Sequence, residues 1–364
     1  MQENNCIVIG AGVIGLSCAY SLVQDGWRVH IVADKFSPDN LSDGVAALWE
    51  PFLAAPSDNE RVLGWSKAAL DKFYSLLRDL GTNTTGIREV VGREFSQKED
   101  PTIALWLQKL MKWRKLGADE VPEGLRKPAS LRIDGIGDFK SGIEYTSLII
   151  EIQKYMPWLN AECKKLGITF EKRKLNTVED IISLSNHFFK PKLIVNCAGL
   201  GNYELLQDKQ MLPIRGHILK VEAPWVDKFY SIVDWESEDL VYILPRSDCV
   251  IVGGTAQRNN WDLTPHPETS RQILERVDLI LPGLGTARVL KEWVGLRPAR
   301  SSMRVEAEKL VSTSNSSSSV DVVHCYGHSG SGVTLSWGCA EEVVRLAKKF
   351  KSIPTDNKCP HSNL

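Results

Sequence analysis

The feature that most constrains this chain is a glycine-rich turn close to its N-terminus. Residues 6–9 form a short apolar run that predicts a strand, and residues 10–15 then read Gly-Ala-Gly-Val-Ile-Gly, the pattern G-x-G-x-x-G. Residues 16–25 carry the apolar periodicity of a helix, and residues 29–32 predict a second strand. A strand, a tight turn, a helix and a second strand in about 30 residues predict the βαβ unit that binds dinucleotides.

Each glycine of this turn has a physical role in holding a pyrophosphate. Gly10 permits the tight turn, Gly12 lets the backbone approach the phosphates, and Gly15 lets the helix pack closely on the strand. The helix N-terminus adds free N–H groups and a partial positive charge. Asp34, at the end of the second strand, is placed to accept hydrogen bonds from the ribose hydroxyls.

A second glycine-rich loop, near the C-terminal end, bears on which dinucleotide is bound. Residues 327–332 read Gly-His-Ser-Gly-Ser-Gly, again between a predicted strand and a predicted helix. An NAD-dependent dehydrogenase needs no such loop, whereas its backbone N–H groups suit the polar edge of an isoalloxazine ring. The two loops together favour FAD. An NAD-dependent dehydrogenase and a purely structural turn are the alternatives.

The composition argues against several other classes of protein. The 364 residues carry a formal net charge of -1, so neither a nucleic acid nor a membrane surface is expected as a partner. No apolar run is long enough for a transmembrane helix, and the first residues lack the pattern of a secretory signal. The eight cysteines contain no C-x-x-C pair, and no donor cluster has ligand spacing. We therefore expect reduced, intracellular core thiols and no metal site.

Segments typical of a dinucleotide-binding domain occur at both ends of the chain. We predict an α/β fold in which a Rossmann-type FAD-binding domain is discontinuous and carries an inserted, sheet-rich α+β substrate domain. Residues 147–166 show a helical pattern. The predicted division assigns residues 1–50, 141–205 and 286–350 to the FAD-binding domain, 51–140 and 206–285 to the substrate-binding domain, and 351–364 to a C-terminal tail.

Specific motifs also recur along nearly the whole chain. They are VIGAGVIGLS at 8–17, DGVAALWEP at 43–51, VNCAG at 195–199, PIRG at 213–216, YILP at 242–245, VGLRP at 294–298, YGH at 326–328 and WG at 337–338. With these motifs the chain resembles the D-amino-acid oxidase family, which includes D-aspartate oxidase. The stretch 55–140 matches less well.

The resemblance implies noncovalently bound FAD and oxidation of a D-amino acid to an imino acid. Water then yields the 2-oxo acid and ammonia, and molecular oxygen is reduced to hydrogen peroxide. One rival is a flavin amine oxidase of the glycine or sarcosine oxidase type, which shares the fold. Another is a flavoprotein with a binding or regulatory role and no turnover.

The resemblance also implies the residues of the site. Arg297 would hold the substrate carboxylate with its guanidinium fork, and the Tyr242 hydroxyl would reach the same carboxylate. The carbonyl of Gly330 would accept a hydrogen bond from the substrate amine. We expect no side-chain base, and His217 and His328 are expected to be structural. The residues expected to bind FAD are Gly10, Ala11, Gly12, Val13, Ile14, Gly15, Ala33, Asp34, Lys35, Ser42, Ala46, Ala47, Leu48, Leu175, Ser329, Gly330, Ser331, Gly332, Val333 and Thr334.

Departures from the family pattern bear on the substrate side chain. D-aspartate oxidases hold the second carboxylate with arginines whose positions here are Ala256 and Trp235, and residues 234–239 include four carboxylates. An unpaired substrate carboxylate in a desolvated pocket is costly. We therefore expect neutral, apolar D-amino acids to be preferred over D-aspartate. D-aspartate oxidase is the alternative, with Arg246 and Arg258 as the nearby basic residues.

The chain ends in Ser362, Asn363 and Leu364, a variant of the peroxisomal Ser-Lys-Leu address. We expect peroxisomal localisation, with the import receptor as a partner, and a cytoplasmic location otherwise. The oligomeric state is left open, with a homodimer among the options.

Overall fold

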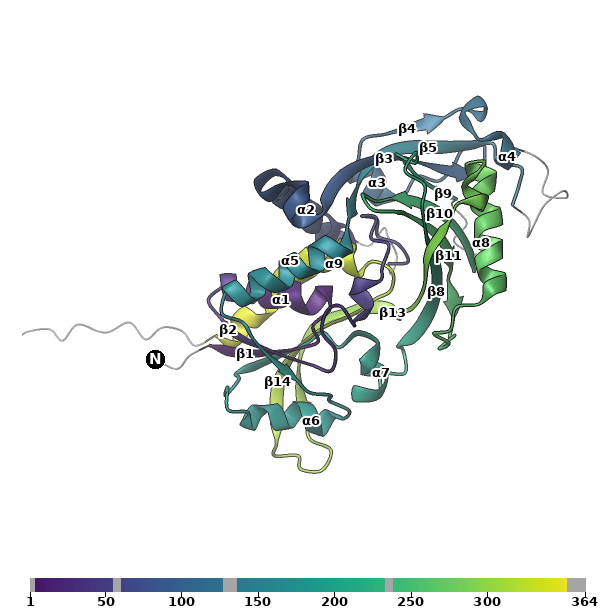
Figure 1. The fold of residues 1–364 in the computed structure, drawn as a ribbon. Coiled ribbons are helices and arrows are strands. Elements are labelled where there is room, and N and C mark those ends of the chain that lie inside the picture. Colours follow the sequence, from purple (N-terminus) through teal and green to yellow (C-terminus); the bar gives the residue numbers. More distant parts are fainter. Residues whose placement is uncertain (1–3, 55–59, 127–135, 233–237, 352–364) are drawn as a thin grey trace, which may run out of the picture.

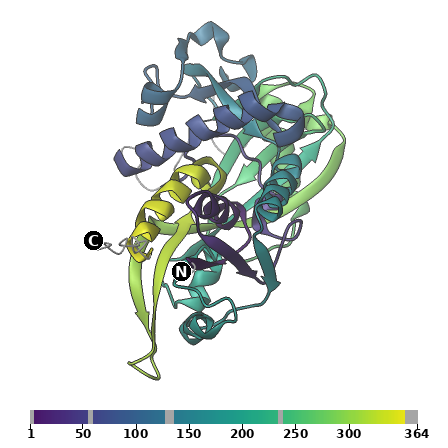
Figure 2. The same cartoon turned by 90° about the vertical axis from the view of Figure 1, so that its left-hand side faces the viewer.

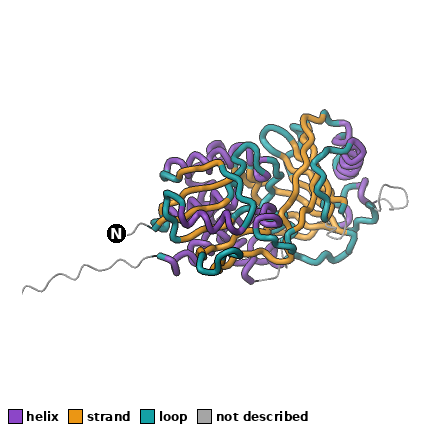
Figure 3. The backbone as a smooth tube through the Cα atoms, turned by 90° about the horizontal axis from the view of Figure 1, so that it is seen from below, coloured by secondary structure: helices purple, strands orange, loops and turns teal. Residues whose placement is uncertain are grey.

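The computed structural model describes residues 4–54, 60–126, 136–232 and 238–351. Within these ranges, fourteen strands join into one continuous sheet that extends through both halves of the molecule (Figures 1 and 3). The predicted C-terminal address and Trp235 lie outside the described residues. No helix in the described ranges is long and apolar enough to cross a membrane.

One half of the sheet is parallel and contains the predicted βαβ unit. The strands are β1 (Asn5–Ile9), β2 (Arg28–Ala33), β6 (Thr169–Lys172), β7 (Leu193–Asn196) and β14 (Ser319–His328), in the spatial order β14-β7-β1-β2-β6. Helix α1 (Val13–Gln24) connects β1 to β2. The predicted strands and helix are thus confirmed, although the helix begins at Val13 rather than at residue 16.

Every residue of β1 is buried because helices cover both faces of the parallel half. Cys6 and Val8 pack in one core cluster with residues of α1, α5 (Ile152–Lys165) and α9 (Gly332–Ala347). Ile7 and Ile9 point to the opposite face and pack with α6 (Val178–Ser183). A strand buried on both faces requires an uninterrupted apolar run, which is the pattern at residues 6–9. Helix α9 contacts both α1 and α2 (Glu60–Thr85) (Figure 2).

The other half of the sheet is mainly antiparallel. Its strands, in spatial order, are β4 (Trp113–Leu116), β5 (Ser141–Ile150), β3 (Ile87–Ser96), β9 (Phe229–Ile232), β10 (Asp239–Pro245), β11 (Val250–Thr255) and β8 (Leu212–Val221). Helix α8 (Pro267–Ile280) covers one face and packs on β8, β10 and β11 in a second core cluster (Figure 1). The smaller elements are β12 (Gln257–Arg258), α3 (Leu105–Leu110), α4 (Glu123–Arg126) and α7 (Asn202–Leu205).

The sequence prediction was wrong at the start of the segment 147–166. Residues up to Ile150 belong to β5, and the helix begins only at Ile152. The run Leu148, Ile149 and Ile150 pairs with β3, so strand pairing overrides the helical periodicity there. Strand β5 therefore lies in the antiparallel half, beyond the predicted boundary at residue 141. The division into two domains stays a prediction.

A single long strand, β13 (Val289–Val311), belongs to both halves. Its first part, up to Ala299, pairs with β8, and its last part, from Arg304, pairs with β14. The pairing is irregular between Ala299 and Arg304, where the strand passes from one half to the other. Arg297 therefore lies close to this crossing point.

Candidate functional site

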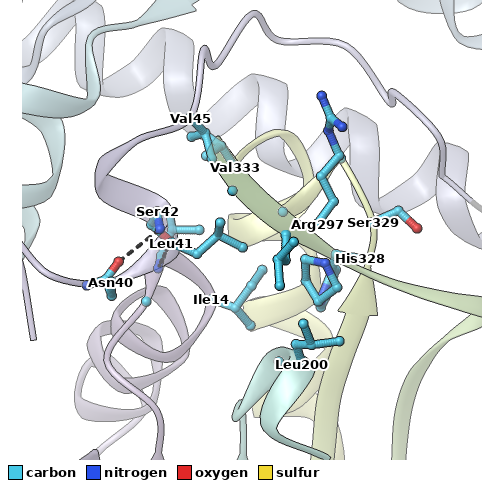
Figure 4. Close-up of a pocket in the computed structure, with 18 of the residues that line it drawn as sticks. Ile14, Asn40, Leu41, Ser42, Val45, Leu200, Arg297, His328, Ser329 and Val333 are labelled. Carbon is cyan, nitrogen blue, oxygen red and sulfur yellow. Dashed lines mark hydrogen bonds between the residues drawn. The ribbon is translucent and has the colours of Figure 1, made fainter. Parts of the chain in front are cut away.

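A cavity of about 660 Å³ opens where the two halves meet, and residues of both halves line it. Figure 4 shows Asn40 and Ser42 on one side of the cavity and Arg297 on the other. The predicted cofactor residues that line it are Gly10, Ala11, Gly12, Val13, Ile14, Ala33, Asp34, Lys35, Ser42, Ala46, Ala47, Leu48, Leu175, Ser329, Gly330, Gly332, Val333 and Thr334. The predicted substrate residues Arg297 and Tyr242 line the same cavity.

Two predicted cofactor residues do not line the cavity, Gly15 and Ser331. A side chain at Gly15 would meet the carbonyl oxygen of Gly10 at 1.9 Å, so this glycine serves the close contact between helix and turn. The buried Ser331 hydroxyl donates a hydrogen bond to the carbonyl of Phe52 at 2.7 Å. Both residues therefore support the cavity wall through contacts within the protein and are not part of its lining.

The N-terminal glycine turn leaves room for a phosphate group. Gly10 has a positive φ of 101°, and a Cβ there would lie 2.5 Å from the carbonyl oxygen of Cys197. Gly12 is the N-cap residue of α1 and has no side chain that could cap the helix, and no acidic residue lies in the first turn of the helix. The Val13 N–H reaches the Ser42 hydroxyl at 3.0 Å. A helix N-terminus without acidic side chains and with backbone this accessible fits a pyrophosphate, so these residues fit FAD.

The segment 46–52 is attached to the N-terminus of α9. The Thr334 hydroxyl donates to the Glu50 carbonyl at 2.8 Å and accepts from the Glu50 N–H at 3.2 Å. A Cβ at Gly330 would lie 2.5 Å from the ring of Phe52, so only glycine permits this close approach. Thr334 thus holds the chain that carries Ala46, Ala47 and Leu48 along the cavity wall.

Arg297 lies inside the cavity with few partners from the protein. Its Nη1 donates to the carbonyl of Thr255 at 2.9 Å, and its Cζ lies 5.6 Å from the centre of the Phe52 ring. Burial lowers the pKa of Arg297, because the charged form has lost solvation, and the Tyr242 hydroxyl beside it opposes that shift. Among the described residues no carboxylate pairs with this guanidinium, so it can accept the carboxylate of a substrate.

Glycines make the space that Arg297 and Tyr242 occupy. A Cβ at Gly216 would lie 2.6 Å from Nη1 of Arg297, and a Cβ at Gly253 would lie 2.4 Å from Cζ of Tyr242. Burial raises the pKa of Tyr242, and the nearby Arg297 charge moderates the increase. The tyrosine therefore stays a neutral hydrogen-bond donor at neutral pH.

The floor of the cavity beside Tyr242 is formed by one row of residues, each on a neighbouring strand. Tyr242 pairs with Ser231, which pairs with Glu94; on its other side Tyr242 pairs with Gly253, and the row continues through Ile218 to Trp293. Directly opposed residues share a face of the sheet. All members except Gly253 line the cavity.

Two glutamates in this part of the cavity were not predicted. Glu94 is 8% exposed, and burial raises its pKa to about 7. Burial, and then repulsion by Glu94, raise the pKa of Glu50 to about 8. Both residues line the cavity. In the sequence, Glu50 stood out only as part of the motif Trp-Glu-Pro. Nothing in the sequence pointed to Glu94, because it reaches this site only through the order of the strands.

The basic residues proposed as alternatives lie elsewhere. Arg246 is buried, and its Nη2 donates to the carbonyls of Val45 and Ala46 at 2.7 and 2.9 Å. Neither Arg246 nor Arg258 lines the cavity. Arg246 instead fixes the backbone of the cavity wall.

The two histidines differ in position. His328 is buried and lines the cavity, with Nε2 3.9 Å from the thiol of Cys325. His217 is buried outside the cavity lining and lies near Ser270 and Glu292. Burial lowers the pKa of His217.

The fold also brings together donor atoms that are far apart in the sequence. In the described ranges three groups have their donor atoms within 4.8 Å of one another: Cys18, Cys197 and Cys325; Cys325, His328 and Cys339; and His30, Glu171 and His187. The expectation of no metal site rested on spacing along the chain, which does not reveal such groups. The seven described cysteines are buried free thiols.

Comparison with known proteins gives consistent results. The family model described as FAD dependent oxidoreductase matches residues 5–346. A D-amino-acid oxidase of Rubrobacter xylanophilus is 35% identical over 342 residues, covering 94% of this chain and 95% of the relative. The human D-aspartate oxidase is 32% identical, covering 96% of both chains. A crystal structure of glycine oxidase from Bacillus cereus has the same fold, with a TM-score of 0.72 at 20% identity and 96% of both chains covered.

Proposed function

We propose that this chain, which belongs to the FAD-dependent oxidoreductase family, oxidises D-amino acids with molecular oxygen. The D-amino acid, oxygen and water would give the 2-oxo acid, ammonia and hydrogen peroxide. The observation that carries the proposal is the guanidinium of Arg297, inside the cavity that the glycine turn also lines and without a carboxylate partner among the described residues.

FAD, when bound, supplies the acceptor for the two electrons that the substrate loses. The residues that would hold it are the turn at Gly10 and Gly12, with α1 behind it, and the segment 46–48 attached to α9. Asp34 at the end of β2 would bind the ribose.

The protein's contribution to the reaction is orientation. The Arg297 fork would bind the substrate carboxylate, and the Tyr242 hydroxyl would donate a further hydrogen bond to it. The Gly330 carbonyl would accept from the amine. Three fixed contacts define which face of the α-carbon is presented, and this positioning contributes several kcal/mol of barrier reduction. His217 is buried outside the cavity lining, so it has no role in proton transfer here.

The cavity supports neutral over acidic substrates. Besides Arg297, the described basic residues of the lining are Lys35, Arg173, Lys174 and His328. Arg173 donates its backbone N–H to the carbonyl of Ala33 at 2.9 Å, which places it and Lys174 at the Asp34 end. The substrate end has instead Glu50 and Glu94, which offer a second carboxylate no positive charge.

A peroxide assay over a panel of D-amino acids tests the proposal. We expect D-alanine, D-valine and D-methionine to exceed D-aspartate and D-glutamate in kcat/KM. If D-aspartate were the best substrate, the D-aspartate oxidase alternative would replace the preference. If glycine or sarcosine were better than all of them, the chain would be a glycine or sarcosine oxidase. A flavoprotein that releases no peroxide with any of them would be a binding protein.

Peroxisomal import is a separate proposal, supported by the ending Ser-Asn-Leu. Imaging of a fusion with a free native C-terminus, with and without residues 362–364, tests it. Identical cytosolic distributions of the two would exclude import by this route.

A further inference from the structure

We propose that Glu50 and Glu94 form a second subsite, which binds the cationic end of a long D-amino acid side chain such as that of D-lysine, D-ornithine or D-arginine. This inference rests on the proposed function and names the substrate class that the same site would favour. It assigns a binding role to two residues that the oxidation itself does not require.

The position of Glu94 relative to Tyr242 sets the length of the ligand. Tyr242, Ser231 and Glu94 are directly opposed on β10, β9 and β3 and therefore point to the same face. Two strand spacings separate Tyr242 from Glu94, which is roughly 10 Å between their backbones. The four methylene groups of lysine place its ammonium roughly 6 Å from its α-carbon when extended. The substrate carboxylate and a hydrogen bond of about 2.8 Å at each end of the ligand cover the remaining length.

Glu94 is a buried carboxyl that faces the cavity without a cationic partner among the described residues. It is 8% exposed and lines the cavity. Among the described residues its carboxyl forms no ion pair and no hydrogen bond of normal geometry. Its neighbour is the buried Tyr145 hydroxyl, which lowers the pKa of the Glu94 carboxyl but does not offset the increase that burial causes. A buried carboxylate is costly unless a cation or several hydrogen bonds stabilise it.

Glu50 lines the same cavity on the segment that Thr334 holds. Its backbone is fixed to Thr334 by two hydrogen bonds, so its carboxyl stays in the cavity. It is close enough to Glu94 for one charge to raise the pKa of the other group. With both pKa values raised, at least one of the two carboxyls is protonated at neutral pH, and a cation entering the site would displace that proton to solvent.

The lining residues next to Glu94 do not compete for the cation, because Ser231, Ile218 and Ile232 are neutral. Arg297 is committed to the substrate carboxylate. A substrate with a carboxylate at one end and an ammonium at the other matches a site with Arg297 at one end and two carboxyls at the other. The neutral stem of the side chain would lie along the apolar wall between them.

The test compares D-lysine with D-norleucine, which has the same apolar stem and no ammonium. We expect the wild-type enzyme to have the higher kcat/KM for D-lysine. The double variant Glu50→Gln/Glu94→Gln should lose at least tenfold in kcat/KM for D-lysine and change less than threefold for D-norleucine. Glu89→Gln is the matched control, because Glu89 is also on β3 but is exposed and accepts a hydrogen bond from the Tyr74 hydroxyl; the variant should change the kinetics of neither substrate.

A binding measurement provides a second readout that does not depend on turnover. 6-Aminohexanoate has the carboxylate and ammonium of lysine without an α-amine, and hexanoate has the carboxylate alone. With FAD bound, 6-aminohexanoate should raise the Tm more than hexanoate, and the double variant should lose this difference.

Each other outcome contradicts a specific statement. Equal losses for D-lysine and D-norleucine in the double variant would assign the glutamates to folding or to the reaction. Unchanged D-lysine kinetics and equal Tm shifts would remove the subsite while D-norleucine oxidation upheld the proposed function. No oxidation of any D-amino acid by the FAD-loaded wild type would refute the proposed function, and the Tm comparison would still test the subsite.

Discussion

The space around Arg297 allows a substitution that moves the guanidinium without removing it. Gly216, on β8, lies beneath the Arg297 side chain, and Gly216→Ala would place a methyl carbon 2.6 Å from Nη1 and 2.7 Å from Cζ. Non-bonded atoms of this kind are comfortable at about 3.5 Å. The guanidinium must therefore retreat by about 1 Å, and its hydrogen bond to the Thr255 carbonyl would be strained.

The expected cost follows from that displacement. A misplacement of about 1 Å in a positioning group costs roughly 10²-fold in rate. That factor corresponds to about 2.7 kcal/mol of lost transition-state stabilisation. We expect Gly216→Ala to lower kcat/KM for D-alanine or D-valine by about this factor, because Arg297 still provides charge but no longer in the right place. FAD content should not change, since Gly216 lies at the substrate end of the cavity.

The assay is steady-state peroxide release, with the flavin spectrum as the measure of bound FAD. Gly64→Ala in α2 is the control, because a Cβ there meets nothing within 4 Å. Alanine also favours a helix over glycine by about 1 kcal/mol, so this control should be fully active and at least as stable. A Gly216→Ala variant with kcat/KM within threefold of wild type would refute the assignment of Arg297 as the carboxylate-binding group.

Three further predictions concern the carboxylate-binding Arg297, the glycine turn that would bind FAD, and the carboxyl of Glu50. Arg297→Ala should lose on the order of 3 kcal/mol or more in kcat/KM, and Arg297→Lys should recover only part because a point charge does not reproduce the fork; near-normal kinetics of Arg297→Ala would contradict this. Gly12→Val should yield colourless protein that FAD does not reconstitute, because even a Cβ at Gly12 would lie 3.2 Å from the Ser42 hydroxyl; a yellow variant would count against the pyrophosphate site. The folded-state pKa of Glu50 is raised from 4.5 to about 8, so its contribution to stability is present below about pH 4.5 and is lost as the pH rises through 8. The Tm of Glu50→Gln relative to wild type, both saturated with FAD, should therefore increase from pH 5 to pH 9, and a constant difference would show that the folded-state pKa is not raised.

The parts of the fold that depend on local sequence could be predicted. The turn at Gly10 and the loop around Gly330 were recognisable because each places several glycines between an apolar run and a helical pattern, and most of their residues line the cavity. The strand at residues 6–9 was recognisable because both of its faces are buried, which requires continuous apolar residues. Such signals need no knowledge of the rest of the chain.

The parts that depend on strand order could not be predicted. Glu94 reaches the cavity only because β3 pairs with β9 and β9 with β10, and no spacing along the chain encodes that sequence of neighbours. The same holds for the group formed by Cys18, Cys197 and Cys325, which meets from three separate elements. The run at Ile149 and Ile150 was assigned to a helix because its partner strand, more than 50 residues earlier, is invisible to local periodicity.

The continuity of β13 has a consequence for how the enzyme is held together. One uninterrupted backbone carries Arg297 and is bonded on one side to β8 and on the other to β14, so the two halves of the sheet are joined by main-chain hydrogen bonds. A rotation between the halves would break those bonds, so the separation of Arg297 from the first glycine turn is fixed before any ligand arrives. Damage to the antiparallel half would then be transmitted along this strand as weaker retention of FAD, and loss of FAD would loosen the place where a D-amino acid binds.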